Sequence, residues 1–147
     1  MSLRKPAMFR DWDPSLPAPQ YGPYRAVICY IVDGDTYDAM VDVGGRTYPY
    51  WTLRLTQADG SGVDTPETNR PASREAGLAA KAYVQQVMPV GSQVVIGTAP
   101  DPESLGRWLA RITIPGGADL AATLIAAGHA TPKHFSVTPS AGADREA

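Results

Sequence analysis

Two short β-type segments joined by a tight turn limit the folds open to this chain more than any other feature. Residues 24–32 are rich in β-branched and aromatic side chains, and residues 37–43 alternate apolar and polar side chains with the period of a strand. Between them stands Asp33-Gly34-Asp35-Thr36, and Asp-Gly pairs are typical of hairpin turns. We therefore expect the fold to begin with an antiparallel hairpin.

The remaining apolar pattern predicts three more strands and two helices. Strands are expected at residues 47–55, 94–98 and 108–114, and helices at residues 73–87 and 120–127. The first helix carries its predicted buried stripe at Ala76, Ala80, Tyr83, Val84 and Val87. The order β-β-β-α-β-β-α predicts a mainly β fold with two or so helices, namely a five-stranded Greek-key barrel of the OB type.

Capping residues support both predicted helices. Ser73 is the expected N-cap of the first helix, and Pro89 ends its apolar pattern. Asp119 is the expected N-cap of the second helix, and Gly128 stands where a helix commonly stops.

The two ends of the chain differ from its centre in composition. Residues 1–23 contain five prolines and almost no apolar periodicity, so we expect an extended or disordered arm. Residues 133–147 are poor in large apolar side chains and are expected to form a flexible tail. In a chain of 147 residues this leaves one folded domain at residues 24–132.

Composition excludes several classes of protein. A hydrophobic fraction of 44% with 19% charged residues excludes a wholly disordered chain, and a net charge of −2 excludes binding of polyanions through a global basic field. The single cysteine, Cys29, forms no internal disulfide. The sequence shows neither a signal peptide nor an apolar run of about 18 residues, so we expect an intracellular, cytoplasmic monomer without membrane partners.

Acidic residues gather in two segments that we expect at strand ends of the same barrel. One is the turn at residues 33–36, and the other is Asp64-Thr65-Pro66-Glu67 within the long polar connection at residues 56–70. Carboxylates from two loops repel each other unless a cation lies between them, and calcium prefers such oxygen ligands. The segments hold no His or Cys, which argues against zinc. Taken singly, each segment also suits ordinary turn or helix-start chemistry.

Two arginines extend this set. Arg54 lies near the end of the third predicted strand, and Arg107 follows Gly106 at the start of the fifth. A phosphodiester is bound well by a planar cation with several donors, which arginine supplies. Considered alone, each residue is better explained as an ordinary surface arginine.

Taken together, these motifs resemble the staphylococcal nuclease (thermonuclease) family. The resemblance covers about residues 24–130 and rests on Val32-Asp33-Gly34-Asp35-Thr36, Leu53-Arg54-Leu55, Asp64-Thr65-Pro66-Glu67-Thr68, Gly106-Arg107, and Leu124-Ile125-Ala126-Ala127-Gly128-His129-Ala130. It implies a calcium-dependent nuclease on an OB-type barrel that hydrolyses DNA and RNA and leaves 3′-phosphate ends.

The resemblance also implies individual roles. The calcium ligands would be Asp35, Asp64 and the backbone carbonyl of Thr65, with Asp33 as a nearby supporting carboxylate. The catalytic residues would be Glu67 as the general base, and Arg54 and Arg107 as the arginines that hold the scissile phosphate.

The sequence departs from the family pattern in two places. Residues 56–62 resemble an inserted loop between Arg54 and Asp64, and Asp59 within it is a further candidate ligand. Before Gly106 the family commonly has a lysine and a tyrosine that contact a terminal phosphate, whereas this chain has Ser104-Leu105. The alternative function is therefore a catalytically inactive module of the same fold that binds nucleic acid or protein.

Aromatic residues and histidines leave further alternatives open. Tyr48, Tyr50 and Trp51 are compatible either with stacking on nucleic-acid bases or with core and cross-strand packing. The residues near the end of the chain either help to close a pocket or lie in exposed chain, and they are His129, His134 and Phe135.

Overall fold

The expected hairpin is present at the start of the described chain. The computed structural model describes residues 13, 15 and 21–133. Its strands are β1 (Tyr21–Asp33), β2 (Thr36–Asp42), β3 (Tyr50–Leu55), β4 (Gly62–Asp64), β5 (Gln93–Pro100), β6 (Arg107–Thr113) and β7 (Thr131–Lys133), and its helices are α2 (Arg74–Val87) and α3 (Leu120–Ala126). None of the helices in this part of the chain has the length and hydropathy needed to span a membrane.

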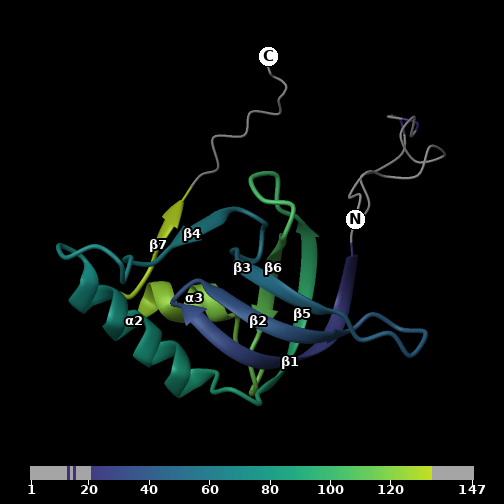
Figure 1. The fold of residues 1–147 in the computed structure, drawn as a ribbon, viewed down its shortest axis with the longest axis horizontal. Coiled ribbons are helices and arrows are strands. Elements are labelled where there is room, and N and C mark those ends of the chain that lie inside the picture. Colours follow the sequence, from purple (N-terminus) through teal and green to yellow (C-terminus); the bar gives the residue numbers. More distant parts are fainter. Residues whose placement is uncertain (1–12, 14, 16–20, 134–147) are drawn as a thin grey trace.

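Five of the strands close into a barrel in the order β1-β2-β3-β6-β5 (Figure 1). The neighbours are antiparallel except β3 and β6, which run parallel because α2 and β5 lie between them in the chain and reverse its direction. β5 pairs with β1 and completes the barrel. This arrangement confirms the predicted OB-type barrel with helices.

The barrel interior is filled by the alternate residues of the strands. Tyr37, Leu53 and Ile96 are among its fully buried side chains, and α3 contributes Leu120 and Leu124. Because every second residue of a strand points inward, the residues between them lie on the outer wall of the barrel.

An aromatic cluster lies where β1, β3 and β6 begin. The rings of Trp51 and Trp108 stack with centroids 4.6 Å apart, and Tyr24 and Tyr21 contact them edge to face. This cluster packs against the core, which assigns Trp51 to core packing.

The boundaries of the folded part differ from the prediction at both ends. β1 begins at Tyr21, which pairs with Thr98 of β5, so residues 21–23 belong to the barrel and not to an N-terminal arm. Lys133, predicted to begin the tail, belongs to β7. The rest of both predicted terminal segments lies outside the described residues.

Two short strands were not predicted. β4 and β7 form a separate two-stranded sheet in which Val63 pairs with Pro132. Each strand has three residues and no alternating pattern long enough to be recognised in the sequence, so the pair exists only because tertiary folding brings the segments together.

The third strand is shorter than predicted. It begins at Tyr50 instead of residue 47, because Pro49 has no N–H to donate and Arg46 adopts a positive φ of 59° in the preceding turn. The carbonyl of Pro49 still accepts a hydrogen bond from the N–H of Val41, at 2.9 Å.

The helices confirm most of the predicted signals. Asp119 caps α3 by accepting a hydrogen bond from the N–H of Ala122, at 2.9 Å, and Gly128 follows that helix with a φ of +81°. In α2 the buried residues are Gly77, Ala80 and Val84, whereas Ala76 is exposed, so the buried face is rotated slightly from the predicted stripe.

Candidate functional site

The β1–β2 turn holds Asp35 in a defined position. The carboxylate of Asp33 accepts a hydrogen bond from the N–H of Gly34 at 3.0 Å, and the buried hydroxyl of Tyr37 donates to the carbonyl of Gly34. Asp35 follows directly and is buried. Asp33 therefore supports the turn itself, and Asp35 faces the interior side of the site.

The turn packs directly on the loop that carries Asp64 and Thr65. A Cβ atom on Gly34 would lie 2.8 Å from Oγ1 of Thr65, so only glycine allows this approach. The N–H of Thr65 donates to Oδ2 of Asp35 at 3.4 Å. The two acidic segments predicted to meet at strand ends do meet.

Arg54 lies between the two carboxylates. It sits near the end of β3, where it pairs with Thr36 of β2. Its Nη2 atom is 2.9 Å from Oδ1 of Asp64 and 3.5 Å from Oδ2 of Asp35. Both acids thus face one nitrogen atom, and the single charge of the guanidinium balances one of their two negative charges.

Lys133 adds a second cation to the same carboxylate. Its Nζ atom lies 3.8 Å from Oδ1 of Asp64, because β7 pairs with β4 beside the site. Lys133 was not among the predicted site residues, because it lies in the segment that we expected to form the tail. The one sequence feature that could have indicated Lys133 is that it is a basic residue shortly after the last apolar segment.

The oxygen atoms at this position fit a hard divalent cation. Asp35 and Asp64 converge, and the hydroxyl oxygen of Thr65 is buried without a hydrogen-bond partner among the described residues. Within residues 21–133, no group of three or more His, Cys, Asp or Glu gathers closely enough to hold a metal ion. A calcium ion here would therefore take two carboxylates, backbone oxygen and water, a donor set that calcium accepts.

Glu67 is held by a different partner. Its carboxylate is about half exposed, and Oε2 lies 3.5 Å from Nε of Arg70. Its backbone is fixed to the start of α2, since the hydroxyl of Ser73 donates to the carbonyl of Glu67 at 2.7 Å. Ser73 stands at the N-cap position but makes no side-chain capping bond to the helix, contrary to the prediction.

Helix α2 approaches this loop through a glycine. A Cβ atom on Gly77 would lie 2.7 Å from the carbonyl oxygen of Pro66 and 2.9 Å from the carbonyl carbon of Glu67. These are backbone atoms, so a larger residue would displace the loop. Gly77 therefore sets the position of Glu67 although it contributes no polar group.

Arg107 is anchored by an acid that the sequence analysis did not single out. Its Nε donates to Oδ2 of Asp101 at 3.0 Å, and the Asp101 side chain is 3% exposed. On the barrel wall Arg107 pairs with Thr52, two residues before Arg54 on β3. The two arginines thus lie on the same outer face of neighbouring strands.

The inserted loop closes on itself. Thr56 and Gly62 form an isolated bridge, and the side-chain amide of Gln57 donates to the carbonyl of Gly62 at 2.8 Å. Asp59 accepts a hydrogen bond from the N–H of Ser61 within the loop, at 2.9 Å. Because the loop returns to its starting point, the additional residues do not displace Asp64 from Arg54.

A small hollow of about 280 Å³ borders the site on the side of Asp64. Asp64, Thr65 and Pro66 line one side of it, and residues 128–131 line the other. The ring of His129 packs on Tyr83, with centroids 4.8 Å apart, so this histidine helps to shape the hollow. His134 and Phe135 lie outside the described residues.

Comparison with known families gives a match over the second part of the chain. Residues 59–146 match the family described as staphylococcal nuclease homologue, which is more than half of the sequence. The match includes Asp64, Glu67 and Arg107, whereas Asp35 and Arg54 precede it. A search of curated proteins found no match.

Proposed function

Because this chain belongs to the staphylococcal nuclease homologue family, we propose that it is a calcium-dependent nuclease that hydrolyses phosphodiester bonds of DNA or RNA and leaves 3′-phosphate ends. The observation that carries the proposal is the convergence of Asp35 and Asp64 on the single Nη2 atom of Arg54. This arrangement combines anionic oxygen ligands with a guanidinium at one point of the barrel wall.

The carboxylates of Asp35 and Asp64 and the carbonyl of Thr65 would hold the calcium ion. A bound ion would polarise a phosphoryl oxygen and lower the pKa of a coordinated water. In the protein alone Arg54 lies against both carboxylates and balances one of their two negative charges. Neutralisation of these acids by the ion would leave the guanidinium available for an oxygen of the substrate phosphate.

Arg107 supplies fixed positive charge to the same face. Its Nε is held by the buried carboxylate of Asp101, which orients the guanidinium and leaves its two Nη groups for another acceptor. Charge develops on the phosphoryl oxygens in the transition state, and preoriented donors stabilise it without reorganisation. Loss of one such donor costs on the order of 100- to 1000-fold in rate.

Glu67 is the proposed general base. It is solvent-exposed and therefore accessible to a water molecule, and its loop is fixed by Ser73 and Gly77. To accept a proton from water, its carboxylate has to exchange the 3.5 Å contact with Arg70 for a hydrogen bond with that water.

One observation favours the alternative function. The Glu67 carboxylate is paired with Arg70, and the carboxylates of the ion site are paired with Arg54. A module that binds nucleic acid or protein without turnover would retain these pairs permanently.

Cleavage of single-stranded DNA with calcium or with a chelator decides between the two functions. We expect chelator-sensitive cleavage, with products that carry a phosphatase-sensitive 3′ end. Glu67→Gln should reduce kcat on the order of 100- to 10,000-fold while substrate affinity stays nearly unchanged. Glu75→Gln, a carboxylate in the first turn of α2, is the matched control and should cleave normally. Oligonucleotide binding without any cleavage would support the inactive module instead.

A further inference from the structure

Strands β1 and β3 and the connection between β2 and β3 carry three exposed tyrosines. Tyr30, Tyr48 and Tyr50 are 54%, 57% and 55% exposed, whereas Trp51 is packed in the aromatic cluster. Stacking on bases, one of the two interpretations left open by the sequence, is therefore available to Tyr48 and Tyr50 but not to Trp51. We call the surface formed by Tyr30, Tyr48 and Tyr50 the tyrosine wall.

Strand register makes the tyrosine wall continuous with the arginines. Across the barrel, Tyr30 pairs with Asp38, Asp38 with Thr52, and Thr52 with Arg107, so these residues form one row. In the next row Met40 pairs with Tyr50. Rows on one face are about 6.7 Å apart and strands about 4.8 Å apart, which places Tyr50 within one or two nucleotide lengths of Arg107.

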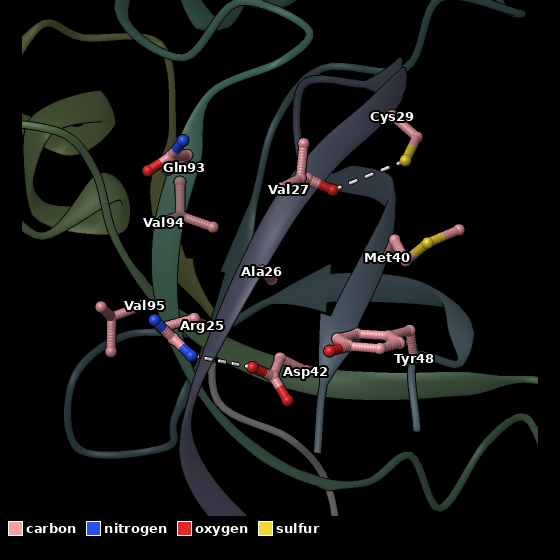
Figure 2. A pocket seen from close by; sticks show the side chains of 10 residues that line it. All are labelled: Arg25, Ala26, Val27, Cys29, Met40, Asp42, Tyr48, Gln93, Val94 and Val95. Atoms are coloured by element: carbon pink, nitrogen blue, oxygen red, sulfur yellow. Dashed lines mark hydrogen bonds and ion pairs between the residues drawn. The ribbon is translucent and has the colours of Figure 1, made fainter. Parts of the chain in front are cut away.

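Beside the wall lies an open hollow of about 730 Å³. Figure 2 shows the ring of Tyr48 beside Asp42 and below Met40, with the side chains of Val27 and Cys29 farther along β1. The walls are mainly apolar, and an ion pair of Arg25 with Asp42, at 3.0 Å, supplies a polar edge. A nucleobase has the matching character, with apolar faces and a polar rim.

Among the residues that line the hollow, Arg25 is the only cation, and it is already paired. Arg25 is neutralised by Asp42, and Asp38 accepts a hydrogen bond from the hydroxyl of Thr52 at 2.8 Å. Tyr50 is a neutral ring near pH 7, as tyrosines ordinarily are, and desolvation and then the negative charge of Asp38 raise the pKa of its hydroxyl further. Attraction on this wall therefore comes from stacking, and the arginines at its end contact the phosphate.

We propose that the tyrosine wall and its hollow bind the bases of single-stranded nucleic acid that flank the phosphodiester held at Arg54 and Arg107. The proposal rests on the proposed function for the position of that phosphodiester. A duplex is a poor ligand because its bases are already stacked on one another, whereas an unpaired base offers its face to an exposed ring. The OB fold commonly binds oligonucleotides across its second and third strands, the strands that carry Tyr50 and Met40 here.

Fluorescence anisotropy with a labelled oligothymidylate of eight nucleotides, in chelator to prevent hydrolysis, tests the proposal. Tyr48→Ala and Tyr50→Ala should each raise Kd on the order of 5- to 100-fold, the range expected for the loss of one stacked base. Tyr48→Phe and Tyr50→Phe keep the ring and should bind nearly as the wild type does. Leu78→Ala, an exposed apolar residue on α2, controls for loss of surface area alone.

Unchanged affinity in both alanine variants would overturn the inference, and so would equal affinity for a duplex of the same length. It would also be overturned if the wild type formed a dimer that the alanine variants lost, because the tyrosine wall would then bind a second copy of the chain. Circular dichroism verifies that each variant is folded. Failure of the proposed function would give a different result. The wild-type protein would then bind the oligonucleotide through these tyrosines but would not cleave it in the presence of calcium. That result would support the proposal of a stacking surface, but on a catalytically inactive module.

Discussion

At the level of a single residue, Arg54 both pairs with the acids of the site and lies next to the proposed phosphate position. It stands between Asp35 and Asp64, and its side chain is only 16% exposed. The Asp35 side chain is 12% exposed and that of Asp64 is 44% exposed, so removal of Arg54 would leave the Asp35 carboxylate largely buried without a compensating charge. The same geometry keeps the guanidinium next to the proposed phosphate position.

Tyr37 provides a prediction at the same scale. Its hydroxyl donates to the carbonyl of Gly34 and is completely buried, and desolvation followed by the charge of Asp35 raises its pKa well above the ordinary value of 10.0. The folded state therefore retains this proton at pH values where the unfolded state releases it. Stability supplied by Tyr37 is present below about pH 10 and falls as the pH rises beyond it.

Chemical denaturation at several pH values between 7 and 11 measures this effect. Tyr37→Phe should lower the free energy of unfolding at neutral pH by about 1–3 kcal/mol, since the buried Gly34 carbonyl loses its donor. It should also flatten the alkaline loss of stability. Tyr48→Phe, an exposed hydroxyl, is the control. An alkaline slope that is the same in wild type and Tyr37→Phe would contradict the assignment.

At the scale of the element, α2 acts as a support for the loop that carries Glu67. Ser73 bonds the carbonyl of Glu67, Arg74 donates to the carbonyl of Thr68 at 3.4 Å, and Gly77 allows the helix backbone to approach Pro66. The start of the helix thus fixes the loop backbone at three points and leaves only the Glu67 side chain free to change partner.

Gly77→Ala tests this support. Helix propensity alone would stabilise the variant by up to about 1 kcal/mol. The added Cβ would contact backbone atoms at 2.7–2.9 Å, so we expect a net destabilisation of about 1–3 kcal/mol and a larger proportional fall in kcat than in substrate affinity. Ala79→Val adds bulk at an exposed position of the same helix. It should leave the activity unchanged and change the free energy of unfolding by no more than about 0.7 kcal/mol. Stabilisation of Gly77→Ala without loss of kcat would refute a positioning role.

At the scale of the whole molecule, the barrel collects charges that lie far apart in the chain. Asp35 comes from the β1–β2 turn, Arg54 from β3, Asp64 from β4 and Lys133 from β7, while the net charge of the protein is −2. These four side chains carry no net charge, so the local attraction of a polyanion would come from the bound calcium ion together with Arg107 and not from the protein as a whole.

Calcium should stabilise the folded protein if Asp35 and Asp64 share the ion. At a concentration of about 100 times Kd the gain is about 2.7 kcal/mol, which corresponds to a rise in Tm of several degrees for a domain of this size. Differential scanning calorimetry without substrate measures this shift independently of activity. Asp64→Asn should abolish it, whereas Asp42→Asn, which removes a carboxylate from the opposite part of the barrel wall, should retain it. A calcium-dependent rise of the same size in Asp64→Asn would place the ion elsewhere.

The sequence by itself determined the elements whose signals are local. Alternation predicted the barrel strands, Asp119 and Gly128 marked the ends of α3, and the acidic segments around Asp35 and Asp64 were recognisable from their order. Each of these signals is carried by neighbouring residues, through the pleat of a strand, a capping hydrogen bond or a turn, and so needs no distant partner.

Only the tertiary structure decided which groups meet. The pairing of β4 with β7 brought Lys133 to Asp64, strand register placed Tyr50 near Arg107, and packing buried Trp51 while leaving Tyr48 exposed. These contacts join residues whose separation along the chain is large, and no short pattern encodes them. Their geometry follows from barrel closure, because closing the sheet fixes which strands are neighbours and therefore which side chains share a face.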